Sequence, residues 1–487
     1  MRRLTLVLLI ALALPAACVR AETATEQEAL NMARNWVTRV ITKYGSWGGS
    51  TEARVTGIQP FMRSDRQLGY FCTVEPRGYL VVSLHKELAP VKAYSETDTV
   101  DPTSDKGMMD VIKHGLERMT DAVEKRLPGK ITTAGTKDLS PLLEIDYKPV
   151  WTQMAVAPTL YRPESERPVV MANYQEGQVI LDSAWHQYWP YNDQCPNLGC
   201  TDPDLNARAL VGCVATAAAQ IMRHWRWPPE CVGGDYADPY DWPNMAATVS
   251  GSSTQAEIDT VAELGHEVGV ACSMDYGCEG SGAYHDDMVS AYENNFRYST
   301  LAIMRKRDDY TAVEWFERMK TQFNVNRPVQ YGIPGHSLVS DGWRESGSPV
   351  VREYHFNYGW RSAGYNTWYV LDALPGGNPD DEEMIENIKP NCCIGSAVGG
   401  PYIPPSYPYR YFDQDATCSV SATFYGGHRL QFLHNVTLTC TSTTGYLYIY
   451  GTTADNTRLF ARGDPTRGVL LSGSTIKMSN GAQIVFR

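Results

Sequence analysis

The clearest helical pattern in the chain lies at residues 211–225, VGCVATAAAQIMRHW. Apolar residues recur there at i, i+4, i+7, i+8 and i+11: Val214, Ala218, Ile221, Met222 and Trp225. This spacing predicts one face of an α-helix, which the pair Pro228–Pro229 then ends. Cys213 falls in the first turn of the predicted helix, directly after a glycine.

A cysteine in the first turn of a helix has two interpretations. Unpaired backbone N–H groups and the helix dipole favour the thiolate there, as a nucleophile requires. A free cysteine is equally one of the most frequently buried residues and can simply pack. The pattern around Cys213 alone leaves both open.

Ahead of this helix, residues 22–130 predict a small α/β unit. TEQEALNMARNWVTRVI and MMDVIKHGLERMTDAVEKRL have helical periodicity. Between them, GYFCTVEPRGYLVVSLHKELAPVKAYS predicts a hairpin and a further strand. Residues 131–178 lack sustained periodicity and contain APTLYRPESERPVV, which is typical of an exposed connector.

The remainder of the chain divides into a mixed region and a β-rich tail. Residues 179–400 carry both helical and strand patterns and end at the proline-rich GGPYIPPSYPYRY. The tail, residues 401–487, has short alternating strands separated by Gly, Ser and Asn. It fits a small β-sandwich or a short β-solenoid, with stability or attachment as its expected role.

Composition narrows the class of protein. A chain of 487 residues suggests about three domains, and 43% hydrophobic with 20% charged residues is an ordinary globular composition. The net charge of −12 and the absence of a Lys/Arg-rich block argue against nucleic acids or anionic membranes as partners. No segment after the first residues is long and apolar enough to be a transmembrane helix.

The amino terminus predicts export. Arg2 and Arg3 precede an apolar stretch, residues 4–17, that is too short to span a bilayer. Small residues at 19 and 21 suit cleavage before Glu22, so residues 1–21 are predicted to be a signal peptide. Lipid attachment at Cys18 is the alternative, but Pro15 stands where such signals carry a leucine-like residue.

Twelve cysteines in an exported chain suggest disulfides. Without Cys18 and Cys213, ten remain, an even number: Cys72, Cys195, Cys200, Cys231, Cys272, Cys278, Cys392, Cys393, Cys418 and Cys440. The pairs Cys195/Cys200 and Cys272/Cys278 could close short loops, and Cys418 and Cys440 lie together in the tail. No CxxC repeat or HExxH motif is present, so neither a metal site nor another cofactor is expected.

A cysteine nucleophile needs a base and an oxyanion donor. RPVQYGIPGHSLVSDGW predicts two strands joined by a Pro334-Gly335 turn, which exposes His336 at the start of the second strand. YHFNYGW places Asn357 on another strand, where its amide could orient an imidazolium, with aromatic residues behind it. Gln187, in AWHQYWPYNDQCP, could complete an oxyanion hole with the Cys213 backbone N–H. Taken singly, each of these residues also has an ordinary structural explanation.

The order Gln187, Cys213, His336, Asn357 resembles that of papain-like cysteine peptidases. Five local strings are more narrowly similar to the streptopain family of secreted bacterial cysteine peptidases: HQYWPYN, GCVATAAAQIMRHW, VGVACSMDYGCEGSGA, GHSLVSDGW and YHFNYGW. The resemblance covers residues 180–390, and residues 22–130 resemble the family's inhibitory propeptide. It implies an α+β fold: a propeptide, a papain-like catalytic domain and, here, an all-β C-terminal domain.

The resemblance also implies roles for individual residues. Cys213 becomes the nucleophile and His336 the base, with Gln187 as oxyanion donor and Asn357 and Trp360 supporting the imidazole. Two further residues would line the substrate cleft: Ser281 and Gly335. The neighbouring histidines, His186 and His355, are expected to point elsewhere.

The chain departs from the family at two places. It has Pro334-Gly335-His336 where the family usually has Gly-Gly-His, and Arg361-Ser362 where two glycines are usual. Because every chemical group is retained, the implied function is a secreted endopeptidase that acts on proteins or peptides through an acyl-enzyme intermediate. It would be made as a zymogen and cut within residues 131–178. An amidase or transglutaminase-like acyltransferase and an inactive binding scaffold remain as alternatives.

Overall fold

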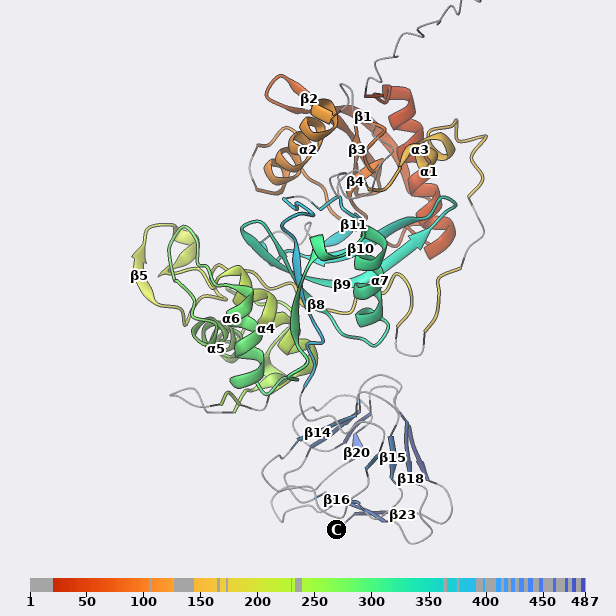
Figure 1. The fold of residues 1–487 in the computed structure, drawn as a ribbon. Coiled ribbons are helices and arrows are strands. Elements are labelled where there is room, and N and C mark those ends of the chain that lie inside the picture. The colour runs from red at the N-terminus through yellow and green to blue at the C-terminus, as the bar shows by residue number, and fades with distance from the viewer. Residues whose placement is uncertain are drawn as a thin grey trace, which may run out of the picture.

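The fold is described from a computed structural model (Figure 1). It describes residues 21–390 except 106, 127–143, 164–166, 172–173, 229, 233–238, 362–365 and 375, and beyond residue 390 only the backbone of short strands. The predicted signal peptide, Cys18, the first part of the connector, Ser362 and the Cys392–Cys393 pair therefore lie outside the described residues.

The N-terminal unit (residues 22–126) is an α/β structure, as its sequence pattern predicts. Its elements are α1 (Glu26–Tyr44), β1 (Arg54–Arg63), β2 (Arg66–Glu75), β3 (Tyr79–Ser83), β4 (Val91–Ser95) and α2 (Gly107–Arg126). The four strands form one antiparallel sheet in chain order. Strand β1 was not anticipated, because its residues alternate poorly between apolar and polar and several are exposed.

The connector is less irregular than its sequence suggests. It contains a short helix, α3 (Lys148–Met154), whose Val150, Trp151 and Met154 are buried. Trp151 donates a hydrogen bond through its ring N–H to the carbonyl of Leu88 in the N-terminal unit (3.1 Å). Two turns of helix are too short for a periodic pattern to stand out, so tertiary packing decides this segment.

The described part of residues 179–390 combines a six-stranded sheet with four α-helices. Its helices are α4 (Cys213–Trp225), α5 (Gln255–Ala271), α6 (His285–Asn294) and α7 (Ala312–Phe323), and its sheet runs in the order β11-β10-β9-β8-β12-β7. These strands are β7 (Ile303–Lys306), β8 (Val329–Ile333), β9 (His336–Ser346), β10 (Val351–Asn357), β11 (Thr367–Val370) and β12 (Glu383–Glu386). A small pair, β5 (Asn197–Cys200) and β6 (Ala207–Arg208), precedes α4, and three short 3-10 turns lie at Pro203–Leu205, Trp242–Asn244 and Arg307–Asp309.

Alternation along β9 builds a core on each face of this sheet. Val339 belongs to the cluster formed with α4, α5 and α6, whereas its neighbour Leu338 belongs to the cluster that includes α7. Figure 1 shows the N-terminal unit above the sheet and helices α4, α5 and α6 grouped at the lower left, beside β8. Strand β11 lies next to β4 of the N-terminal unit.

The C-terminal region is a parallel β-solenoid, the second of the two folds its pattern predicts. Three sheets share it, in the orders β13-β15-β18-β22, β14-β17-β21-β20 and β16-β19-β23, and every pairing is parallel. The strands are β13 (Ala397–Val398), β14 (Tyr409–Phe412), β15 (Ala416–Cys418), β16 (Ala422–Phe424), β17 (Arg429–Phe432), β18 (Thr437–Cys440), β19 (Tyr446–Ile449), β20 (Leu459–Phe460), β21 (Val469–Leu471), β22 (Thr475–Met478) and β23 (Gln483–Phe486). From β14 onward successive strands visit the three sheets in turn, except that β20 and β21 lie side by side in one sheet, and this order is the winding of a solenoid.

The architecture is thus α+β with an all-β C-terminal region, as expected. Within the described part of the chain, no helix has the length and apolar character that crossing a membrane requires.

Candidate active site

Cys213 is the first residue of α4, so its thiol sits at the helix N-terminus as the sequence predicts. Gly212 precedes it with φ +91°, and a Cβ at that position would lie 2.6 Å from Met274 Sδ. Both the backbone conformation and the close approach of Met274 therefore require glycine before the cysteine.

The electrostatics of Cys213 differ from the simple expectation for a helix N-terminus. Burial raises the pKa of the Cys213 thiol, whereas the backbone N–H groups of Ser337, Val214 and Cys213 itself act in the opposite direction. Burial has the larger effect, so the thiol is favoured over the thiolate in this structure.

His336 begins β9, directly after the two-residue turn Pro334-Gly335. Gly335 has φ +74°, the left-handed conformation that such a turn demands. The Nε2–H of His336 donates a hydrogen bond to the Tyr358 carbonyl (2.8 Å), and the Trp360 ring lies 5.0 Å from the imidazole. Burial lowers the pKa of His336 to about 4, so the imidazole is neutral near pH 7.

Both groups line one cleft of about 670 Å³. Six of the seven residues selected from the sequence contribute to its wall: Gln187, Cys213, Ser281, Gly335, His336 and Trp360. None of the hydrogen bonds found among the described residues joins the Cys213 thiol to the His336 imidazole. The two groups thus share a cleft, both in their neutral forms.

Gln187 lies in a bend, with its backbone tied to the residues just before α4. Its carbonyl accepts a hydrogen bond from the Val211 N–H (3.1 Å), which brings Gln187 close to the start of α4. Gln187 lines the same cleft as Cys213. This arrangement is compatible with an oxyanion donor, and that role stays a prediction.

Ser281 lines the cleft but its hydroxyl is occupied by backbone groups. Its Oγ donates to the Leu210 carbonyl (2.8 Å) and accepts from the Gly277 N–H (3.0 Å). Ser281 therefore closes its own loop and attaches that loop to the segment before Cys213. A direct contact with substrate stays a prediction.

The hydrogen bonds of Asn357 found among the described residues go to groups other than the imidazole. Its amide nitrogen donates to the Ser183 carbonyl (2.8 Å) and to Gln220 Oε1 (2.9 Å), and its oxygen accepts from the Gly359 N–H (3.0 Å). Because Gln220 belongs to α4, Asn357 connects the end of β10 to this helix. The predicted support of the imidazole stays a prediction.

Two histidines set aside on sequence grounds indeed lie elsewhere. The Tyr188 N–H donates to His186 Nδ1 (3.2 Å), and His186 packs edge-on against Tyr191 with its pKa lowered by burial to about 4. His355 is bonded through Nδ1 to Asp341 (2.5 Å) and packs against Trp368. Neither residue lines the cleft.

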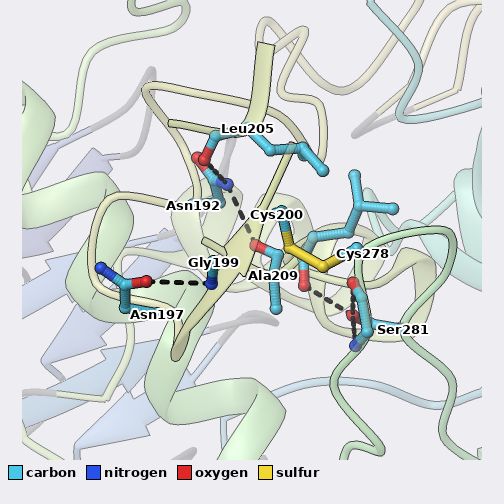
Figure 2. The surroundings of a disulfide bond; sticks show 10 residues. Asn192, Asn197, Gly199, Cys200, Leu205, Ala209, Cys278 and Ser281 are labelled. Carbon is cyan, nitrogen blue, oxygen red and sulfur yellow. Dashed lines mark hydrogen bonds between the residues drawn. A yellow bond between two sulfur atoms is a disulfide. The ribbon is translucent and has the colours of Figure 1, made fainter. Parts of the chain in front are cut away.

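The disulfide pattern corrects the pairing expected from the sequence. Cys200 is bonded to Cys278, 78 residues away, and Ser281 lies on the same loop as Cys278 (Figure 2). The expected short loops, Cys195 with Cys200 and Cys272 with Cys278, are wrong, because Cys195 and Cys272 are separate buried thiols. Pairs close in sequence are not necessarily close in space, and here the fold brings β5 to the loop after α5.

The parity of the cysteines does not identify the nucleophile. Cys72 and Cys231 are also free and buried, so five described cysteines lack a disulfide partner. Cys213 differs from the other free cysteines because it is partly exposed in the cleft. Cys72 and Cys195 are buried, and burial raises the pKa of each thiol to about 12. Cys418 and Cys440 face each other in register on parallel strands, and their side chains lie outside the described residues.

Charged residues along the cleft wall were not found by sequence reasoning. The Cys200–Cys278 bond joins two loops that place acidic residues there: Asp202, Asp204 and Glu279. Arg361, one of the departures from the family pattern, also lines the cleft and forms an ion pair with Asp204. No local pattern could reveal this wall, because its parts come from distant segments.

The N-terminal unit reaches the same cleft. Asp110 and Val111, in the first turns of α2, line it together with Cys213 and His336. Val111 also packs against Gly376: a Cβ added to Gly376 would lie 3.0 Å from Val111 Cγ1.

Comparisons with known proteins agree with this arrangement. A model of the peptidase C10 family matches residues 185–369, and one of the Spi protease inhibitor matches residues 21–120. The thiol protease/hemagglutinin PrtT of Porphyromonas gingivalis is 27% identical over 262 residues, 48% of this chain and 29% of its own length. Streptopain of Streptococcus pyogenes is 24% identical over 364 residues, 66% of this chain and 80% of its own.

A solved structure shares the fold. Prointerpain A of Prevotella intermedia superposes with a TM-score of 0.50 at 23% identity, covering 69% of this chain and 99% of its own. The inhibitor match coincides with the N-terminal unit, and the peptidase match begins at Trp185 and includes Cys213 and His336. Residues 185–369, which contain Cys213 and His336, therefore match the peptidase C10 family of cysteine peptidases.

Proposed function

We propose that this protein is a cysteine endopeptidase that is exported and made as a zymogen, with proteins or peptides as substrates. The observation that carries the proposal is the shared cleft, where a cysteine at a helix N-terminus and a histidine at a strand start are accompanied by Gln187 and Trp360. This is the set of groups that thiol-dependent acyl transfer needs. Export rests on residues 1–21, whose sequence is typical of a signal peptide.

The proposed chemistry follows from the position of each group. Since His336 Nε2 carries the hydrogen that Tyr358 accepts, Nδ1 is the nitrogen left to take the Cys213 proton. The thiolate attacks the peptide carbonyl, and the Cys213 N–H and the Gln187 amide stabilise the resulting oxyanion. The imidazolium then protonates the leaving amine, and water hydrolyses the thioester.

The N-terminal unit is proposed to keep the enzyme latent. Asp110 and Val111 occupy part of the cleft wall, and no hydrogen bond found among the described residues joins His336 Nδ1 to the Cys213 thiol. A base without a hydrogen bond to the nucleophile cannot take its proton efficiently. Release of the N-terminal unit would open the cleft and allow the two groups to meet.

The test uses the chain from residue 22 to residue 487 with Cys213→Ser, which cannot cleave itself, and a trace of active enzyme. We expect a cut within residues 131–178, in the exposed stretch between α3 and the buried Tyr174. In the wild-type chain, activity on a fluorogenic peptide should rise as this cut accumulates and disappear with a thiol-reactive inhibitor. Full activity of an uncut wild-type precursor would contradict the zymogen.

The alternatives predict different products in the same assay. An acyltransferase would join the acyl group to an added amine in preference to water, whereas an inactive scaffold would release no amine from any peptide. The amino terminus of the mature protein, determined by mass spectrometry, locates both the signal cleavage and the maturation cut.

A further inference from the structure

A second histidine lies directly behind the catalytic pair. His285 is the first residue of α6 and only 8% of its surface is exposed. Its Nδ1 is 2.6 Å from Glu383 Oε1, and its Nε2 is 2.8 Å from Ser337 Oγ. Both ring nitrogens are therefore engaged, one by a carboxylate and one by the residue that follows His336.

The sheet register creates the space for this imidazole. Gly332 on β8 pairs with Glu383 on β12 and with Ser337 on β9, so the three residues stand abreast on neighbouring strands. A Cβ at Gly332 would lie 2.4 Å from His285 Cε1 and 2.8 Å from Glu383 Cγ. The missing side chain of Gly332 lets His285 bridge from Glu383 to Ser337.

Ser337 connects this bridge to the nucleophile. Its backbone N–H is one of the donors that lower the pKa of the Cys213 thiol. Its Oγ accepts a hydrogen bond from Gln330 Nε2 (3.1 Å), and the same Nε2 also donates to the carbonyl of Val214, the second residue of α4. His285 Nδ1–H donates to the Glu383 carboxylate, and His285 Nε2 bonds to the Ser337 hydroxyl, so each side chain in this chain of bonds has a partner.

We propose that His285 is a positioning residue for the catalytic pair. Held by Glu383, it fixes Ser337 so that the Ser337 N–H stays on the Cys213 sulfur and the start of β9 holds His336 at the cleft. This inference rests on the proposed function, since it assigns His285 to the same thiol chemistry. His285 contributes to turnover through Ser337 and does not touch the substrate.

Two substitutions separate the two bonds of His285. In His285→Asn the amide sits where Nδ1 was, so the bond to Glu383 is kept and that to Ser337 is lost. In His285→Gln the longer side chain places its amide near the former Nε2, within reach of Ser337. We expect His285→Asn to lower kcat about tenfold with KM within about twofold, and His285→Gln to retain most of kcat.

The partner residue gives a second comparison. Ser337→Ala should reproduce the loss in kcat of His285→Asn, and the double variant should be no slower than either single variant, because both remove one contact. Losses that multiply in the double variant, or a folded His285→Asn enzyme with wild-type kcat, would overturn the proposal. Should His285→Asn fail to fold, Gly332→Ala is the replacement, since it displaces the imidazole without removing it.

A control and an independent measurement distinguish this inference from the proposed function. His355→Asn alters another buried histidine–carboxylate pair, outside the cleft, and should keep kcat within about twofold of wild type.

The rate of Cys213 alkylation by iodoacetamide, followed by peptide mass spectrometry, measures the reactivity of the thiol without turnover. If the wild type hydrolyses no peptide, the proposed function fails, and a slower alkylation in His285→Asn than in His355→Asn still supports the inference. Equal alkylation rates in the two variants would overturn it.

Discussion

Among the contacts that the N-terminal unit makes with residues 179–390, two differ clearly in character. At the sheet-side contact (Arg39, Tyr94, Arg344 and Glu353), Tyr94 donates to the fully buried Glu353 (2.7 Å) and accepts from Arg344 (3.0 Å). Arg39 of α1 adds an ion pair to the same Glu353 (3.5 Å). Around these polar groups the two parts share an apolar core that includes Trp36 with Trp368 and Val370.

The cleft-side contact (Asp110 and Val111) is much smaller. Only these two residues of the N-terminal unit line the cleft, and neither forms a described hydrogen bond with a catalytic residue. Most of the attachment energy therefore lies away from the chemistry, since buried polar networks and apolar area dominate such contacts. The comparison indicates that the unit is anchored at the sheet and reaches the cleft only with its edge.

The largest expected effect comes from removing the proposed nucleophile in the cleft while the sheet-side contact is left unchanged. Cys213→Ala should reduce peptide hydrolysis at least about 10⁴-fold, because the attacking sulfur is gone, and His336→Ala should have a similar effect. Urea unfolding of the Cys213→Ala precursor should match that of wild type within about 0.5 kcal/mol. Cys195→Ala, which alters a buried thiol outside the cleft, is the matched control and should stay active. Wild-type hydrolysis in Cys213→Ala would remove the assignment.

The second prediction concerns the oxyanion donor. Gln187→Ala should lower kcat by about 10²–10³-fold while leaving stability nearly unchanged, because one donor to the transition state is lost. Steady-state kinetics of the matured enzyme measure this effect. Gln194→Ala changes a nearby amide that bonds only to the Asp259 carbonyl on the surface, and it should leave kcat unchanged. An unaltered kcat in Gln187→Ala would place the donor elsewhere.

The site residues were predictable to the extent that their signals are local. The helix at Cys213 and the hairpin around Gly335 follow from periodicity and turn chemistry, which act over a few neighbouring residues. The bonds of Asn357 to Ser183 and Gln220 were not predictable, since they join segments up to 174 residues apart. The Cys200–Cys278 pairing and the Glu383–His285–Ser337 bridge belong to the same class.

The fold shows the same boundary between local and non-local signals. Helices α1 and α2 and the hairpin β2–β3 match their sequence patterns closely. Strand β1 and helix α3 were missed because one alternates weakly and the other has only two turns. In the tail, alternation predicts strands equally for a sandwich and a solenoid, and only the parallel pairing distinguishes them.

A third prediction measures the sheet-side contact directly. Tyr94→Phe removes the hydroxyl that serves Glu353 and Arg344, and should destabilise the Cys213→Ala precursor by about 2–3 kcal/mol because buried charged groups lose a partner. Val111→Ala, at the cleft-side contact, should cost less than about 1 kcal/mol. Urea denaturation gives both values. A larger loss for Val111→Ala than for Tyr94→Phe would reverse the comparison and place the anchor in the cleft.

The smallest expected effect is a pH dependence of precursor stability that comes from His336, in the cleft. The pKa of His336 is about 4 in the folded precursor, below the unfolded value of about 6.5. Between these values the unfolded chain binds more protons, so the stability due to His336 is present above pH 6.5 and is lost as the pH falls toward 4.

In His336→Gln, whose amide can still donate to Tyr358, this part of the pH dependence should disappear. Because the imidazole is partly exposed, the Cys213→Ala precursor should lose about 1–2 kcal/mol more than its His336→Gln form between pH 7 and pH 4.5. Tyr94→Phe, altered only at the sheet side, should keep the full slope. Parallel curves for the precursor and its His336→Gln form, measured by urea denaturation at each pH, would show that His336 is not the group that titrates.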